Sequence, residues 1–276
     1  MSTMSDRERA VSLRMRDDFE HYALKCLKIR PKAGPIVPLR LNPAQRYLHA
    51  AVEKQRHATG KVRVLVLKGR QEGISTYVAA RFFHRVTHFK GQRVYILTHQ
   101  QDATDNLFGF VDRFHEYLPD LMRPETGTSS AKELSFSRLD SGYKVATAGT
   151  RGAGRSQTIQ LFHGSEVALW PNAEDHAAGA LQAVPDMEGT EVILESTGYG
   201  MGNYFHQQWQ AAEAGQSDYI AVFIPWFSMP EYRRPAEGFK PSPEETEYAE
   251  NNGLDMEQMA WRRAKTSELK DEALFM

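Results

Sequence analysis

The sequence predicts an α/β fold in which helices flank an open, mostly parallel sheet. Short apolar, β-branched segments alternate with helical segments along most of the chain. Residues 62–67 (VRVLVL) and 93–98 (RVYILT) are typical of strands buried on both faces, and a helical pattern follows each. Such alternation produces parallel strands connected by crossover helices, with helices on both faces of the sheet.

The N-terminal elements are indicated by capping residues and by an amphipathic pattern. Residues 6–29 are expected to form one charged amphipathic helix, followed by an extended, proline-rich stretch. Asn42 followed by Pro43 is an N-cap with proline at the first helical position. That helix is expected to end at Gly60.

The remaining elements follow from periodicity and turn residues. Helices are expected over 75–89, 102–117, 173–184 and 203–214. Strands are expected over 158–163, 191–194 and 219–224, with a hairpin formed by 133–137 and 143–148. The composition changes near residue 228, where proline, glutamate and arginine become frequent. We therefore predict a lead-in over 1–41, an α/β domain over 42–228 and a linker over 229–276.

The composition is that of an ordinary globular protein, with 41% hydrophobic and 25% charged residues. No apolar run approaches the length of a membrane span, so no membrane association is expected. Cys26 is the only cysteine, which excludes an intrachain disulfide and suits a reducing cytosol.

The charge is unevenly distributed along the sequence. Residues 1–155 contain 27 Lys and Arg against 15 Asp and Glu, a net charge of +12, whereas residues 156–276 carry −13. A basic half suits an anionic partner such as a nucleotide or DNA. The alternative is that the two halves interleave in space and the asymmetry has no meaning.

A candidate phosphate-binding loop occupies residues 68–76 (KGRQEGIST), between a buried strand and a helix. Backbone N–H groups and a helix N-terminus hold phosphate oxygens at such a place. In the standard pattern G-x-x-x-x-G-K-[ST], Gly73 and Ser75 match the second glycine and the hydroxyl. Lys68 stands at the first glycine and Ile74 at the lysine, so the match is weak when taken alone.

An acidic position follows the strand expected over 158–163. In phosphate-loop ATPases a second strand beside the first ends in an Asp-Glu pair, whose aspartate holds Mg²⁺ and whose glutamate orients water. Ser165 takes the place of this aspartate and Glu166 that of the glutamate, so Ser165 is expected to reach the metal through water. A surface glutamate after a strand is the alternative. His163 lacks the neighbours of a metal ligand and is set aside.

Four segments together resemble the large terminase subunits of tailed bacteriophages. They are residues 68–76, 154–156 (GRS), 163–172 (HGSEVALWPN) and 194–200 (LESTGYG), which occur in the order of that family. The resemblance covers roughly residues 40–230, and its specificity lies in the ordered set. It implies a phosphate-loop NTPase of the ASCE/RecA-like class, corresponding to the N-terminal ATPase domain.

The resemblance implies roles for residues of the loop and of the acidic strand. Many terminases replace the usual loop lysine with an earlier basic residue, which favours Lys68 or Arg70. Glu166 matches the catalytic glutamate and is also expected at the metal, and Ser75 matches the hydroxyl on the metal. The residues expected to surround the nucleotide are Gln45, Lys68, Gly69, Arg70, Gln71, Glu72, Gly73, Ile74, Ser75, Thr76 and Thr197.

The resemblance extends to residues outside the loop. Thr197 matches a hydroxyl that senses the γ-phosphate, with Glu195 expected to orient it. Gln45 looks like the glutamine that reads adenine. Arg155, or with less support Arg151, falls where the family places an arginine that acts in a neighbouring subunit.

The function implied by the resemblance is hydrolysis of ATP with Mg²⁺, coupled to translocation of double-stranded DNA into a procapsid. Its expected partners are a portal protein, a small terminase subunit and further copies in a ring, in the cytoplasm of an infected bacterium or from a prophage. The family's nuclease domain is expected to lie beyond residue 276. The alternatives are a helicase-like ATPase, or a nucleotide- or DNA-binding module with a decayed site, which Ile74 and Ser165 favour.

Overall fold

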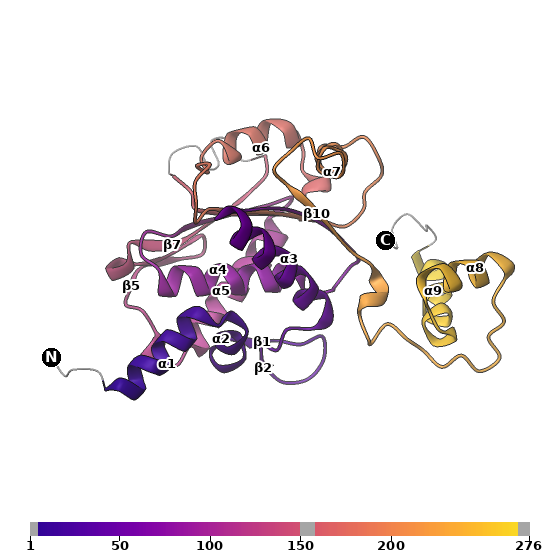
Figure 1. Cartoon of the computed structure of the whole chain (residues 1–276), viewed down its shortest axis with the longest axis horizontal. Coiled ribbons are helices and arrows are strands. Elements are labelled where there is room, and N and C mark those ends of the chain that lie inside the picture. Colours follow the sequence, from indigo (N-terminus) through magenta and orange to yellow (C-terminus); the bar gives the residue numbers. More distant parts are fainter. Residues whose placement is uncertain (1–4, 150–157, 270–276) are drawn as a thin grey trace.

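The computed structural model describes residues 5–149 and 158–269, and it has three layers. A twisted sheet lies between a group of helices that includes α3, α4 and α5 and a second group formed by α6 and α7 (Figure 1). The predicted open sheet with helices on both faces is therefore confirmed. Within the described residues, no helix is long and apolar enough to cross a membrane.

The N-terminal region contains two helices where the sequence pattern predicts one. Helix α1 (Asp6–Asp17) ends before Asp18, and α2 (Phe19–Cys26) begins after it. The Asp18 carboxylate accepts a hydrogen bond from the backbone N–H of His21, so this residue caps a new helix rather than continuing the first. The proline-rich stretch forms a small antiparallel pair, β1 (Lys28–Ile29) and β2 (Val37–Pro38).

The next elements agree closely with the expected boundaries. They are α3 (Pro43–Thr59), β3 (Val62–Lys68), α4 (Ile74–His88), β4 (Arg93–Thr98) and α5 (Gln101–Tyr117). Asn42 and Gln45 form a capping box at the start of α3, and Gly60 ends this helix in the left-handed region at φ 73°.

The second half completes the sheet and the other helical layer. Its strands are β5 (Thr126–Ser130), β6 (Glu133–Phe136), β7 (Ser141–Thr147), β8 (Leu161–Ser165), β9 (Glu191–Ser196) and β10 (Ile220–Ile224). Its helices are α6 (Ala173–Leu181), α7 (Tyr204–Glu213), α8 (Pro243–Asn252) and α9 (Met256–Leu269). Single 3₁₀ turns lie at Asp120–Met122, Ser137–Leu139, Val167–Leu169 and Trp226–Ser228.

Within the described residues, eight strands form one sheet in the order β10-β3-β9-β8-β4-β7-β6-β5. The six strands from β10 to β7 are parallel to their neighbours, and β6 and β5 add an antiparallel edge. The acidic strand, β8, was expected directly beside the strand before the loop, β3. This expectation is wrong, because β9 lies between the two. Strands from the two halves of the sequence interleave at one side of this sheet, where β3 lies between β10 and β9, which supports the alternative that their opposite net charges do not mark two separate regions.

Two differences from the predicted strands have local causes. Strand β8 extends to Ser165, because Ser165 still pairs in register with Glu195 on β9. Strand β5 was not predicted, since its sequence TGTSS is fully exposed and has no apolar alternation. The predicted hairpin between β6 and β7 is confirmed.

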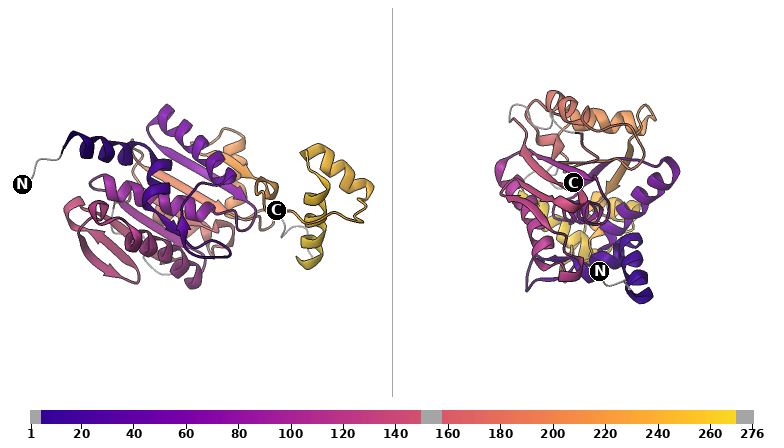
Figure 2. Two further views of the ribbon diagram at one scale, coloured as in Figure 1. Left: turned by 90° about the horizontal axis from the view of Figure 1, so that it is seen from below. Right: turned by 90° about the vertical axis from the view of Figure 1, so that its left-hand side faces the viewer.

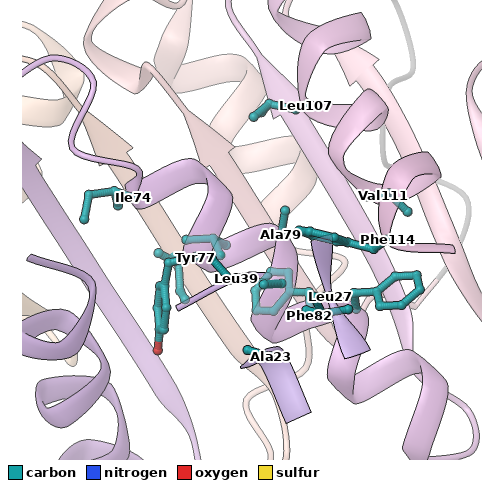
Figure 3. Packing of buried hydrophobic residues seen from close by; sticks show 14 of the residues in the cluster. Ala23, Leu27, Leu39, Ile74, Tyr77, Ala79, Phe82, Leu107, Val111 and Phe114 are labelled. Carbon is teal, nitrogen blue, oxygen red and sulfur yellow. The ribbon is translucent and has the colours of Figure 1, made fainter. Parts of the chain in front are cut away.

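The larger of two apolar clusters lies between the sheet and the layer of α2, α3, α4 and α5. Helix α4 is its centre, with Tyr77, Phe82 and Phe83 almost completely buried. Figure 3 shows side chains from α2, α4 and α5 meeting in this layer. The second cluster packs α6 and α7 against the opposite face. Both faces of the sheet are thus covered, as a parallel sheet requires.

The C-terminal helices α8 and α9 lie beyond the end of the sheet, at the opposite end of the molecule from α1 (Figure 2). Trp261 of α9 stacks on Tyr232, with ring centroids 4.4 Å apart, and also on Trp226 at 5.2 Å. The region predicted as a linker therefore contains two helices, of which α9 packs on the segment that leaves β10. Its continuation toward a nuclease domain stays a prediction.

A buried charge network ties α4 to the amino end of β9. The Arg81 guanidinium donates to both oxygens of Glu191, at 2.6 and 3.0 Å, and to Glu53 at 2.6 Å. The side chains of Arg81 and Glu191 are 5% and 1% exposed, so neither charge is hydrated. Removing one member of such a pair leaves the other buried and uncompensated.

We predict that Glu191→Gln lowers the free energy of unfolding by about 3 kcal/mol, because Arg81 then keeps only Glu53 as a charged partner at hydrogen-bond distance. Asp140→Asn breaks an ion pair with Arg93 in which both side chains are exposed, and it is expected to cost less than about 1 kcal/mol. Urea denaturation followed by circular dichroism measures both. Equal losses in the two variants would contradict a special contribution from the buried pair.

Candidate functional site

The candidate site is built on the loop between β3 and α4. Gln71 and Gly73 both have left-handed backbone conformations, with φ 59° and 77°, and Gly73 is the N-cap of α4. The backbone N–H groups of residues 70–76 donate to no backbone acceptor in the described part of the chain. A row of unpaired N–H groups at a helix N-terminus is a favourable place for an anion.

The carbonyl groups of this loop are held by donors from elsewhere in the chain. Asn42 donates to the carbonyl of Glu72 at 3.0 Å, and Gln45 to that of Gly73 at 2.7 Å. The Tyr232 hydroxyl donates to the carbonyl of Arg70 at 2.7 Å. The start of α3 and the segment after β10 therefore both fix the shape of the loop.

Lys68, the last residue of β3, lies between two carboxylates. Its Nζ is 2.9 Å from Glu166 Oε1 and 3.1 Å from Glu195 Oε2, and its side chain is 6% exposed. Burial lowers the pKa of Lys68, but Glu195 and Glu166 raise it more, so the pKa lies above its ordinary value. The ammonium is thus a fixed positive charge where three strands end.

Glu166 follows directly after β8 and is held in one orientation. Its Oε2 accepts hydrogen bonds from the backbone N–H and the hydroxyl of Thr197, both at 3.0 Å. Its backbone is left-handed, with φ 51°, a strained conformation for a residue with a side chain. The side chain is 21% exposed, so this carboxylate reaches both Lys68 and solvent.

Glu195 has partners that the sequence pattern does not predict. Its Oε1 accepts from the Ser75 hydroxyl at 2.6 Å and lies 3.3 Å from His163 Nε2. The expectation that Glu195 orients Thr197 is wrong, since Thr197 donates to Glu166 instead. The only signal for these contacts along the chain is that Glu195 lies near the end of a strand in a parallel sheet, where functional groups gather.

The other predicted loop residues divide into buried and exposed groups. Glu72 and Ile74 are buried, whereas Arg70 and Gln71 are exposed, and Gly73 and Thr76 are intermediate. A side chain on Gly69 would place its Cβ 2.8 Å from the Glu72 carboxylate, which explains a glycine there. The Arg70 side chain makes no ion pair with any residue that the structure describes. Arg151 and Arg155 lie outside the described residues.

Gln45 lies beside the loop, as predicted, but its amide already has partners. Its Oε1 accepts from the backbone N–H of Asn42 at 3.0 Å, and its Nε2 donates to Gly73. One N–H and one lone pair of the amide remain for a ligand. Its role in reading adenine stays a prediction.

The oxygen donors at this site suit Mg²⁺, which takes hard oxygen ligands and keeps several waters. Ser75 presents a hydroxyl in the first turn of α4, with Glu166, Glu195 and Ser165 at the adjoining strand ends. In the described residues, no group of three or more His, Cys, Asp and Glu forms a ready-made metal site. Ser75, Glu166 and Ser165 are the groups of this site that could hold such a cation.

The strand order and the loop at the end of β3 define a RecA-like α/β fold, and comparisons with solved structures show that phage large terminases have it. The chain matches the large terminase of bacteriophage HK97 with a TM-score of 0.62 and 15% identity, covering 92% of this chain and 52% of the terminase. It matches that of the thermophilic bacteriophage D6E with a TM-score of 0.55 and 10% identity, covering 76% and 50%. No protein-family model and no curated protein matches the sequence. The chain thus spans about half the length of these terminases and shares their fold.

One loop residue gives this site a predicted pH dependence. Burial raises the pKa of Glu72 from its ordinary 4.5 to about 8, although Lys68 and the Gly69 N–H act to lower it. Between these two values the folded chain binds more protons than the unfolded chain, so stability falls as the pH rises. For one group the slope is at most about 1.4 kcal/mol per pH unit.

We therefore predict that Glu72→Gln removes this part of the pH dependence and makes the protein more stable than the parent at pH 9. Urea unfolding between pH 5 and pH 9 measures the effect. The exposed Glu237 serves as the control, since Glu237→Gln should keep the parent's slope. The same slope in parent and Glu72→Gln would show that Glu72 is ionised at neutral pH.

Proposed function

We propose that this chain is the ATP-hydrolysing domain of a phage DNA-packaging terminase. The observation that carries the proposal is the meeting of three groups at one end of the sheet: unpaired loop N–H groups, the buried ammonium of Lys68, and the carboxylate of Glu166. These are the parts needed to bind a polyphosphate and to position water against it. The D6E large terminase, whose fold is similar, has been solved in complex with ADP.

In the proposed complex, the backbone of the loop binds the phosphates of ATP. The N–H groups of residues 70–76 and the N-terminus of α4 supply hydrogen-bond donors and positive partial charge. Ser75 and Glu166 would hold Mg²⁺, and Ser165 would contact it through water. When bound, Mg²⁺ neutralises charge that develops on the phosphates.

Glu166 is proposed to act on the attacking water. The oxygen of water attacks the γ-phosphorus, the bond from that phosphorus to the β–γ bridging oxygen breaks, and ADP departs. Glu166 orients the water and accepts its proton, while Thr197 keeps the carboxylate in place. Because Thr197 contacts Glu166 directly, a shift of Thr197 on γ-phosphate loss would also move the catalytic carboxylate, which supports its proposed role as sensor.

Lys68 and Arg70 differ in position, which supports different roles for them. Lys68 is buried against the two carboxylates, so its charge is available at a fixed point for phosphate binding. The side chain of Arg70 is exposed and free of ion pairs with the described residues, so it can reach charge that develops during the reaction. Arg155, or Arg151, is proposed to enter the site of a neighbouring subunit.

The larger assembly is proposed from the similarity to the terminases. ATP hydrolysis by this domain would drive double-stranded DNA into a procapsid, within a ring of copies docked on a portal protein and supplied by a small terminase subunit. The place of action would be the cytoplasm of the infected bacterium. An ATPase assay under conditions that allow assembly decides between this proposal and the decayed-site alternative, which predicts binding without turnover.

We predict that Glu166→Gln slows ATP hydrolysis by ~10²–10⁴-fold while ATP affinity stays within a few-fold of the parent's. The amide keeps the shape of the side chain but accepts no proton from water. Turnover should be measured at high protein concentration or with procapsid and DNA, because a neighbouring subunit is expected to contribute an arginine. Glu213→Gln, at an exposed position ending α7, is the control. Full turnover in Glu166→Gln would place the catalytic carboxylate elsewhere.

We further predict that Lys68→Met mainly weakens ATP binding and that Arg70→Ala mainly lowers kcat, each by at least about tenfold. Methionine approximates the length of the Lys68 side chain but carries no charge. Binding is measured by titration calorimetry, and kcat by steady-state phosphate release. If neither variant differs from the parent in either quantity, the site has no functional cation and the decayed-site alternative is favoured.

A further inference from the structure

Glu195 has a completely buried carboxylate that is contacted by polar groups from three other elements. Its side chain is 0% exposed, yet it contacts Ser75 of α4, Lys68 of β3 and His163 of β8. The shortest contact is the 2.6 Å hydrogen bond from the Ser75 hydroxyl. Burying a carboxylate costs free energy unless the charge is paired. The number of partners around Glu195 therefore indicates a defined task for its charge.

Glu195 is also the residue paired in register with Ser165 on the neighbouring strand. His163, two residues before Ser165, contacts Glu195, which shows that both strands present these positions on the face toward α4. Neighbouring strands lie about 4.8 Å apart. A carboxylate is therefore present one strand away from the position where the acidic strand has serine.

We propose that Glu195 supplies the metal-side carboxylate that Ser165 does not provide, and that it acts by positioning Ser75 for Mg²⁺. This inference rests on the proposed nucleotide site. Because Ser75 donates its hydrogen to Glu195, the lone pairs of its oxygen are left for the cation. The negative charge of Glu195 further favours a divalent cation beside the hydroxyl.

The sheet order gives this relocation a simple physical basis. Strand β9 lies between β3 and β8, so its end is one strand closer than the end of β8 to β3, from which the loop leads into α4. Glu195 reaches Ser75 directly, whereas Ser165 is one strand further from β3. Outer partners that orient a metal ligand typically change metal affinity by 10–100-fold when removed.

The competing explanation is that Glu195 only neutralises Lys68. Both explanations predict some loss of stability in Glu195→Gln, so stability does not separate them. The Mg²⁺ dependence of nucleotide binding addresses the difference, because an unchanged affinity for the metal would leave only the role toward Lys68. A raised midpoint alone does not decide, since the ammonium that Glu195→Gln leaves uncompensated also repels a cation. Returning a carboxylate to β8 provides a second test, since the Ser165 position faces the same side of the sheet.

The experiment measures ADP binding to the full chain by titration calorimetry, first in EDTA and then over a range of Mg²⁺ concentrations. In Glu195→Gln we expect the Mg²⁺ midpoint to rise about 10–100-fold, with ADP affinity in EDTA within a few-fold of the parent's. In the double variant Ser165→Asp/Glu195→Gln we expect the midpoint to return toward the parent's. Glu213→Gln is the control and keeps the parent's midpoint.

Two results would overturn the inference, and a third would reject the proposed function on which it rests. An unchanged Mg²⁺ midpoint in folded Glu195→Gln would overturn the inference while leaving ADP binding, and hence the proposed function, intact. A raised midpoint that Ser165→Asp does not lower would assign the effect to Lys68. A parent that binds no ADP with or without Mg²⁺ would instead reject the proposed function itself. If Glu195→Gln does not fold, Glu195→Asp carries the same test, since it keeps the charge but shortens the reach toward Ser75.

Discussion

The buried ammonium of Lys68 is the constraint on which the site depends. A charge removed from water costs several kcal/mol unless good partners compensate it, and two carboxylates within 3.1 Å supply that compensation. The partners come from β8 and β9, so one cation joins the carboxyl ends of three strands. The ends of these strands form the chemical site, and the shared ammonium holds them at fixed positions relative to one another. Apolar packing within the sheet does not determine these positions by itself.

The loop next to Lys68 is fixed by a different set of contacts. Its carbonyl groups accept hydrogen bonds from Asn42, Gln45 and Tyr232, which belong to segments far apart in sequence. Holding the carbonyls in this way leaves the N–H groups on the loop free of backbone partners. Donors that are oriented before a ligand arrives need no reorganisation when it binds, which is the general basis of electrostatic preorganisation. Tyr232 also stacks on Trp261, so α9 is connected to the loop through one side chain.

Local signals in the sequence were sufficient for most of the elements, but not for the site. The strand–loop–helix unit and the caps at Asn42 and Gly60 were predictable because each depends on neighbouring residues. The break at Asp18 was missed, since a side-chain cap competed with a continuous amphipathic pattern. The contact between Ser75 and Glu195 spans 120 residues and depends on β9 lying between β3 and β8. Periodicity carries no information about strand order, so this contact was not predictable.

Solvent access separates the two carboxylates that share Lys68. Glu166 is 21% exposed, whereas Glu195 is completely buried beneath the loop. A carboxylate that orients an attacking water must be reached by that water, and only Glu166 meets this requirement. A carboxylate that fixes a metal-bound hydroxyl needs no solvent access, and burial strengthens its electrostatic effect. The same ammonium therefore binds two carboxylates whose different exposure to solvent suits them to different tasks. The spacing of Glu166 and Glu195 along the sequence does not reveal this difference in exposure.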